Sequence, residues 1–172
     1  MNTRKKLMAE YAASDRQGTQ DPLPLFVYGT LLSGFGNHRL LAGNRCAFLG
    51  AATVKGFELH GYPIPCAQFS SLPEAEVMGE MYAFPEKKYQ DILELIDRLE
   101  AEGRWYCRLR VTAQHAGQSV EAWMYVVTDE RKPLGEPYFD YRAKDADSKY
   151  ISVRVFDEDG RDEDGLTEED YR

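Results

Sequence analysis

LFVYGTL, from Leu25 to Leu31, is the stretch on which the fold of this chain depends. Its first four residues, Leu25 to Tyr28, are apolar or aromatic and predict a strand buried on both faces, while the following Gly-Thr predicts an abrupt bend. Where a glycine interrupts a strand, the next two or three N–H groups can point outward together, and such clusters attract carboxylates and oxyanions. On its own, the pattern is more typical of an ordinary turn, because these residue types are common in turns.

The length and composition are those of a single globular domain. The chain has 172 residues, 43% of them hydrophobic and 12% aromatic, which is enough to bury about two thirds of the surface of the unfolded chain. No apolar run approaches the roughly 18 residues that a membrane-spanning helix needs, and no apolar run follows the early Lys5 and Lys6 as in a secretory signal. The three widely spaced cysteines fit neither a disulfide framework nor a metal knuckle. We therefore expect reduced thiols in a cytoplasmic protein.

The negative charge is concentrated at one end of the chain. The net charge is −8, and residues 157–172 alone contain nine acids and two arginines. Such a tail is usually a solvated end, and the functional alternative is a contact with a basic partner. Nothing in the sequence is basic enough for nucleic-acid binding, and nothing indicates an oligomeric state. We expect residues 1–23 to form a flexible leader, 24–145 the folded domain and 146–172 an acidic extension.

Strand signals dominate the middle of the chain. Asn37 is expected to cap a short helix through residue 41 that Gly43 ends. Residues 62–71 contain two prolines and are too irregular for a central strand, and residues 77–84 alternate imperfectly, with Glu80 and Tyr82 on one face. The other strands, two of them joined by a turn at 116–118, are expected at 46–54, 56–59, 106–113 and 120–128. Without a βαβ rhythm, this pattern favours an α+β fold, a small mostly antiparallel β-barrel flanked by a few helices.

One helix stands out among the strands. Residues 86–101 read EKKYQDILELIDRLEA, and Gly103 follows as a stop signal. The apolar side chains recur at helical spacing and form one face: Tyr89, Ile92, Leu93, Ile96 and Leu99. This is the clearest secondary-structure prediction in the chain.

A carboxylate falls on the apolar face of this helix. At about 100° per residue from Ile92, Glu100 lies near 80°, between Tyr89 and Leu93, and Asp97 lies on the border near 140°. Burial of a lone carboxylate costs several kcal/mol or raises its pKa, and negative charge in the last turn also opposes the helix dipole. Glu100 is therefore a candidate general acid–base. The alternative is that it turns to solvent or pairs with a nearby arginine, Arg104 or Arg108.

The remaining candidates are weaker. The three histidines, His38, His60 and His115, have no ligand spacing that would predict a metal site. Arg108 and Arg110 alternate along one strand, which is typical of a solvated face. The tyrosines of the strands are expected to pack, although a hydroxyl at a barrel mouth could bind a substrate.

The motifs quoted above occur in an order that resembles the γ-glutamylcyclotransferase superfamily. The resemblance rests on FVYGTLLSGFGNHRLL (26–41), GEMYAF (79–84), LIDRLE followed by WYCRLRV, and a closing DYR (140–142). The most similar branch is the γ-glutamylamine cyclotransferase and AIG2-like group. The segment AEGRW, after Glu100, departs from the family pattern. The match implies a small β-barrel flanked by helices, with a pocket at the YGTL loop.

The resemblance also implies an activity and a site. The loop that binds the γ-glutamyl group, largely through backbone N–H groups, matches Tyr28, Gly29, Thr30 and Leu31. The catalytic glutamate matches Glu100, and the tyrosine near the substrate matches Tyr106. The implied reaction releases 5-oxoproline and an amine from a small γ-glutamyl amine or amide, and no metal or cofactor is expected. The alternative is a non-catalytic member that binds a small acidic metabolite or a protein partner.

Overall fold

The computed structural model describes residues 22–100, 106–127 and 135–147. Nearly all of the expected leader and of the acidic extension lie outside these residues, as do the divergent segment after Glu100 and Arg104 within it. The described chain forms two units that divide between Tyr141 and Arg142. The described residues of the second unit, 142–147, belong to one helix, α4 (Tyr141–Asp147). Everything else described below belongs to the first unit.

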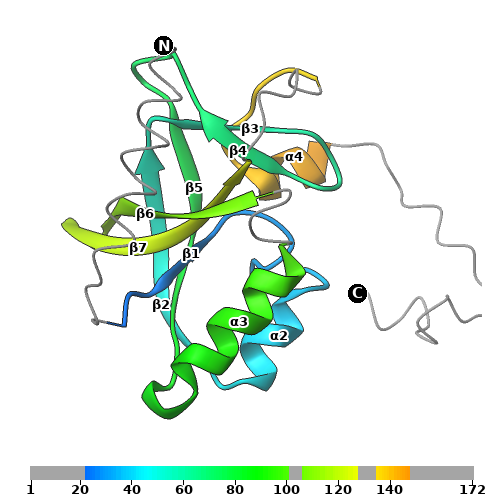
Figure 1. Ribbon diagram of the computed structural model, residues 1–172. Helices are drawn as coiled ribbons and strands as arrows, with labels where there is room; N and C mark the ends of the chain where they lie inside the picture. Colours follow the sequence, from blue (N-terminus) through cyan, green and yellow to red (C-terminus); the bar gives the residue numbers. More distant parts are fainter. Residues whose placement is uncertain (1–21, 101–105, 128–134, 148–172) are drawn as a thin grey trace, which may run out of the picture. The chain divides into compact units, whose positions relative to one another are not determined.

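A closed barrel of five strands forms the centre of the first unit. Its strands are β1 (Leu25–Val27), β2 (Ala47–Lys55), β5 (Glu76–Ala83), β6 (Tyr106–His115) and β7 (Gln118–Val127). They close in the order β1–β5–β2–β6–β7 (Figure 1). All neighbouring pairs are antiparallel except β1 and β7, which meet in parallel at Leu25 and Trp123. The expected α+β fold with a mostly antiparallel barrel is confirmed.

A second, two-stranded sheet lies outside the barrel. It pairs β3 (Phe57–His60) with β4 (Cys66–Phe69) in antiparallel register. The irregular segment 62–71 therefore contains a short strand that is not a barrel strand, in line with its prolines. Gly50 and Gly56 both have positive φ, the first at a register shift in β2 and the second between β2 and β3, which accounts for the interrupted strand signal there.

The long helix begins later than its sequence pattern predicts. Residues Glu86–Lys88 form a 3₁₀ turn, η1, and the α-helix proper, α3, runs over Tyr89–Leu99. Lys88, with φ −117° and ψ 5°, is not helical, so the two segments are separate. Ile92, Leu93 and Ile96 are buried as expected, but Leu99 is 39% exposed, because it is the last helical residue and lies at the edge of the apolar arc.

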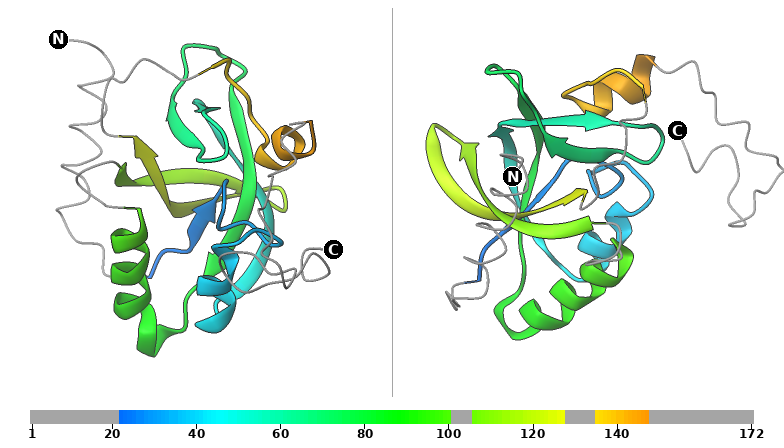
Figure 2. Two further views of the ribbon diagram at one scale, coloured as in Figure 1. Left: turned by 90° about the vertical axis from the view of Figure 1, so that its right-hand side faces the viewer. Right: turned by 45° about the horizontal axis from the view of Figure 1, so that its top comes forward.

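A short helix, α2 (His38–Gly43), follows the loop after β1. Asn37 occupies its N-cap position but its side chain does not cap the helix. It donates a hydrogen bond instead to the Thr30 hydroxyl oxygen, at 2.9 Å. Both α2 and α3 lie at the end of the barrel opposite the β3–β4 sheet (Figures 1 and 2).

The core fills the barrel and the space beneath α3. Strand β1 is buried along its whole length, as its sequence predicts. Both faces of β5 are buried near its end: Met81 is fully buried, but so are Glu80 at 8% and Tyr82 at 2% exposure. Among the residues that the structure describes, no helix is long and apolar enough to cross a membrane.

Candidate active site

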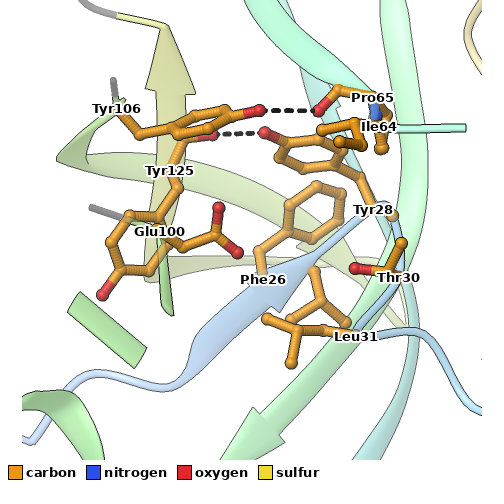
Figure 3. A pocket seen from close by; sticks show the side chains of 11 residues that line it. Phe26, Tyr28, Thr30, Leu31, Ile64, Pro65, Glu100, Tyr106 and Tyr125 are labelled. Atoms are coloured by element: carbon orange, nitrogen blue, oxygen red, sulfur yellow. Dashed lines mark hydrogen bonds between the residues drawn. The ribbon is translucent and has the colours of Figure 1, made fainter. Parts of the chain in front are cut away.

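A pocket opens at the end of β1, between that strand, the loop that joins β3 to β4, the end of α3, and the strands β6 and β7 (Figure 3). Its lining contains all six residues that the sequence singled out for the site. Residues 28–31 come from the turn after β1, Glu100 from the end of α3 and Tyr106 from the start of β6. Five further residues complete the lining: Phe26, Val27, Ile64, Pro65 and Tyr125.

The turn after β1 contributes unused backbone donors. The Leu32 N–H donates to the Gly29 carbonyl at 2.9 Å, and the Asn37 N–H donates to the Thr30 carbonyl at 3.1 Å. In the part of the chain that the structure describes, no group accepts a hydrogen bond from the N–H of Gly29, Thr30 or Leu31. Three successive donors without an internal acceptor are suited to hold an anion or a carbonyl oxygen.

Gly29 is required by close packing and not by its backbone conformation. It is not among the glycines with positive φ. A Cβ atom at this position would lie 2.4 Å from Cγ of Pro65, the buried proline of the loop between β3 and β4. The prediction of a bend that only glycine permits is therefore wrong in its reason. The glycine lets Pro65 press against the turn and so form one wall of the pocket.

Glu100 immediately follows α3, as its C-cap. Its own N–H donates to the Ile96 carbonyl at 2.9 Å, and its carboxylate points into the pocket toward Phe26 (Figure 3). No described residue donates a hydrogen bond to this carboxylate. Burial raises the pKa of Glu100 from an ordinary value of 4.5 to about 7. The alternative pairing with Arg108 is not observed, because Arg108 binds Asp97.

The tyrosine hydroxyls around the pocket each donate a hydrogen bond within the protein. Tyr28 donates to the Tyr125 carbonyl at 2.7 Å, and Tyr106 donates to the Pro65 carbonyl at 3.2 Å. The Tyr125 hydroxyl donates to Asp97. Burial raises the pKa of Tyr28, Tyr106 and Tyr125 well above the usual value, so all three stay neutral. The Tyr106 oxygen can still accept a hydrogen bond, which adds an acceptor to the side of the pocket that Glu100 lines.

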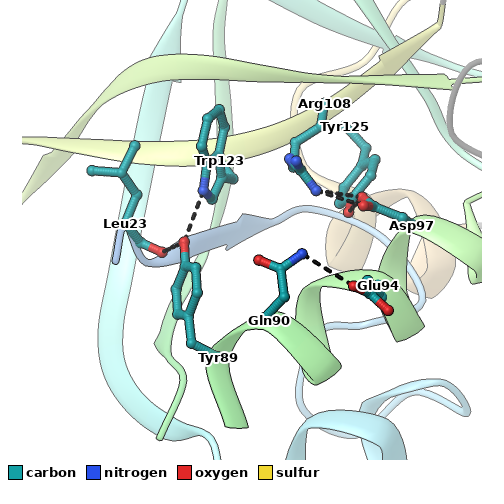
Figure 4. Close-up of polar contacts among 8 residues, drawn as sticks. All are labelled: Leu23, Tyr89, Gln90, Glu94, Asp97, Arg108, Trp123 and Tyr125. Atoms are coloured by element: carbon teal, nitrogen blue, oxygen red, sulfur yellow. Dashed lines mark hydrogen bonds and ion pairs between the residues drawn. The ribbon is translucent and has the colours of Figure 1, made fainter. Parts of the chain in front are cut away.

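The end of α3 is anchored to the barrel one turn before Glu100 (Figure 4). Asp97 accepts hydrogen bonds from Nη1 of Arg108 on β6, with both carboxylate oxygens at 2.6 Å, and from Tyr125 on β7. The Arg108 guanidinium also lies 4.9 Å from the ring centre of Trp123. The prediction of a solvated face is therefore wrong for Arg108, since Asp97, at the border of the helix face, turns toward β6.

The start of α3 is held as well. The Tyr89 hydroxyl donates to the Leu23 carbonyl at 3.0 Å and accepts from Nε1 of Trp123 at 2.9 Å (Figure 4). Contacts at both ends of the helix thus fix the position from which Glu100 extends.

Other groups that the sequence raised lie outside the pocket lining. His60 contacts Glu58 at 2.9 Å, and His38 and His115 contact backbone carbonyls. Among the described residues, no group of three histidine, cysteine or acidic side chains could hold a metal ion. All three cysteines are described and are free thiols.

Three lining residues escaped the sequence reasoning as parts of a site. Ile64 and Pro65 lie in the proline-rich segment between β3 and β4, where no periodicity marks a site. Tyr125 was expected to pack within its strand, with substrate binding by a strand tyrosine only as an alternative. Its place beside the turn depends on the closure of the barrel, which brings β7 against β1.

The sequence also matches a known family. The family described as "Gamma-glutamyl cyclotransferase, AIG2-like" matches residues 25–143. The chain belongs to this family. The match includes every described residue of the pocket, and it confirms the superfamily that the motifs indicated.

Individual members of the family show the same similarity. A Gamma-glutamylaminecyclotransferase from Bos taurus is 31% identical over 131 residues, which cover 68% of this chain and 73% of the bovine protein. A protein of Methanocaldococcus jannaschii, provisionally named a gamma-glutamylcyclotransferase, is 32% identical over 122 residues, 69% of this chain and 97% of the other. The crystal structure of an AIG2-like protein from Mus musculus matches with a TM-score of 0.53 at 28% identity, over 67% of this chain and 87% of that chain.

Proposed function

We propose that this protein is a γ-glutamylcyclotransferase in which Glu100 is the general acid–base. It converts a γ-glutamyl amine or amide into 5-oxoproline and a free amine. The observation that carries the proposal is the placement of a partly buried carboxylate, with its pKa raised to about 7, in the same pocket as a turn that has three unused backbone N–H groups. Membership of the cyclotransferase family supports the reaction class.

The two sides of the pocket suit the two ends of such a substrate. The N–H groups of Gly29, Thr30 and Leu31 can hold the substrate carboxylate, or the γ-carbonyl oxygen as it becomes an oxyanion. Glu100 and the Tyr106 oxygen form an acceptor side, which suits the α-ammonium group. A γ-glutamyl substrate carries both kinds of group on one short chain.

The reaction needs no nucleophile from the protein. The α-amino nitrogen attacks the γ-carbonyl carbon of the same molecule, and this new C–N bond closes a five-membered ring. Glu100 takes a proton from the α-ammonium group and returns one to the departing nitrogen as the original amide bond breaks. The ring nitrogen keeps one of the three α-ammonium protons and the other two leave on the departing nitrogen as an ammonium ion, so Glu100 regains its starting state; we expect no metal or cofactor.

The raised pKa of Glu100 fits both steps. A carboxylate of ordinary pKa is too weak a base to take a proton from an ammonium group efficiently. With a pKa of about 7, the same group can accept a proton in one step and donate it in the next near neutral pH.

The proposal is tested by a screen of γ-glutamyl amines, amides and amino acids with direct detection of 5-oxoproline. We expect turnover by the wild type and a loss of about 100-fold or more in Glu100→Gln, the usual range for removal of a general acid–base. Glu94→Gln is the matched control, since Glu94 is exposed on the same helix and binds only Gln90 among the described residues. Activity of Glu100→Gln within tenfold of the wild type would show that the assignment is wrong.

A further inference from the structure

A buried carboxylate outside the pocket lining has no part in the proposed reaction. Glu80, on β5, is 8% exposed. Its Oε2 accepts hydrogen bonds from the Ser33 N–H and the Tyr82 hydroxyl, both at 2.9 Å, and its Oε1 accepts one from the Ser33 hydroxyl at 2.7 Å. A carboxylate withdrawn from water is tolerated only with such partners, so these contacts explain how the charge is accommodated.

Two of these donors belong to one residue of the loop. Ser33 uses both its N–H and its hydroxyl, one on each oxygen of Glu80. This double contact fixes the orientation of the peptide group at Ser33 as well as its position. Ser33 comes two residues after Leu31, the last of the three unused donors.

Strand β5 therefore holds the turn at both ends. Before the turn, Val27 pairs directly with Glu80 in the ladder between β1 and β5. After the turn, Ser33 is bound by the side chain of that same glutamate. Gly79 allows this close approach, because a Cβ atom there would lie 2.2 Å from the Val27 carbonyl oxygen. The segment that carries the N–H groups of Gly29 to Leu31 spans two points fixed by a single neighbouring strand.

We infer that Glu80 is a positioning residue for the proposed reaction. It is not among the residues that line the pocket. It keeps the turn between Val27 and Ser33 in the one arrangement in which the three N–H groups face the pocket. The inference rests on the proposed function for its kinetic consequence, but the hold on the turn is a property of the protein alone and can be measured separately.

Two variants separate the positioning role from a general loss of packing. Glu80→Gln keeps the size of the side chain but removes its charge, so the contacts to the loop lose their charge-assisted strength and the Ser33 hydroxyl must accept from the new NH₂ group instead of donating. Tyr82→Phe is the matched control, because it removes a donor to the same carboxylate that lies on β5 itself and not on the loop. In Glu80→Gln we expect faster amide hydrogen exchange in a peptide covering residues 28–35 and a KM at least about tenfold higher, a change of about 1.4 kcal/mol. In Tyr82→Phe we expect both within about twofold of the wild type.

The pH midpoint of kcat provides the second readout. Since Glu80 acts on the binding turn, Glu80→Gln should keep the midpoint set by Glu100. A fall in kcat with an unchanged KM, or unchanged exchange in residues 28–35, would overturn the inference.

A third variant covers the case in which Glu80→Gln does not fold. Ser33→Ala removes only the hydroxyl contact, and we expect faster exchange in residues 28–35 and a KM about threefold higher; if neither changes, Glu80 does not position the turn. The exchange measurement also separates the two proposals. If the wild type turns over no γ-glutamyl compound, the proposed function fails, while exchange still shows whether Glu80 holds the turn.

Discussion

The two sides of the pocket are built in different ways. On one side, the turn after β1 offers backbone N–H groups, whose directions depend on the path of the chain between two points on β5. On the other, α3 offers the single side chain of Glu100, whose place depends on the anchor at Asp97 one turn earlier. The first side depends on a glycine and its neighbours, and the second on one carboxylate. Substitutions in the turn should therefore mainly weaken substrate binding, and substitutions on the α3 side should mainly slow the chemical step.

The largest effect is expected on the turn. Gly29→Ala would place a Cβ atom 2.4 Å from Pro65, so the turn and the opposite wall must separate and the N–H groups lose their alignment. We expect kcat/KM to fall about 100-fold to 1000-fold, the range for the loss of oxyanion donors, measured by 5-oxoproline release.

Gly43→Ala serves as a control for that experiment. Gly43 is exposed at the end of α2 and has nothing within 4 Å of the position of a new Cβ atom. Its activity should match the wild type. Equal losses in the two variants would mean that contact with Pro65 is not what makes Gly29 necessary.

At Glu100, a substitution that removes activity should increase the stability of the folded protein. Below about pH 4.5, its carboxyl group is protonated in both the folded and the unfolded protein. Between pH 4.5 and about 7, the unfolded chain releases the proton while the folded protein retains it, so the wild type loses stability as the pH rises through this window and no more above it. Glu100→Gln avoids the loss. We expect its free energy of unfolding to exceed that of the wild type by about 3 kcal/mol at pH 8.

The comparison at low pH checks this origin of the gain. Near pH 4, a protonated Glu and a Gln are equivalent in charge and similar in shape, so denaturant unfolding should give nearly equal stabilities. A gain of the same size at both values of pH would show that the charge of Glu100 is not its cause.

The smallest of the three effects is expected at the anchor of α3. Asp97→Asn keeps the shape of the side chain but weakens its contacts with Arg108 and Tyr125. The end of the helix then holds Glu100 less firmly. We expect kcat to fall about tenfold, or about 1.4 kcal/mol, with KM within about threefold of the wild type. A rise in KM with an unchanged kcat would assign Asp97 to binding and would remove the contrast between the two sides.

The sequence predicted the local features of both sides because each has a local cause. The apolar run of β1 ends at the turn, and the helical period placed Glu100 among the apolar residues of α3. The same period misplaced Leu99, which is exposed, because the count of angles does not show where a helix end leaves the core. The family motifs then joined the two segments, which no local rule relates.

Features that depend on distant contacts were not predictable in this way. The alternation with a period of two placed Glu80 and Tyr82 on the face of β5 opposite its core residues. Both are nevertheless buried, because Ser33 and His38, in the loop and helix that follow β1, cover that face. The loop with Ile64 and Pro65 has no periodicity, and its role as a wall follows from its packing on Gly29. The pairing of Asp97 with Arg108 likewise depends on where β6 passes α3.

The pH dependence of kcat/KM tests the central claim most directly, since it reports the ionisation of Glu100 in the free enzyme while turnover proceeds. Because the base must be ionised to accept a proton, we expect activity to rise with pH to a plateau, with a midpoint near pH 7. The residual activity of Glu100→Gln should lack this limb. A midpoint near the ordinary carboxyl pKa of 4.5, or the same limb in Glu100→Gln, would contradict the role of Glu100 as the buried general acid–base.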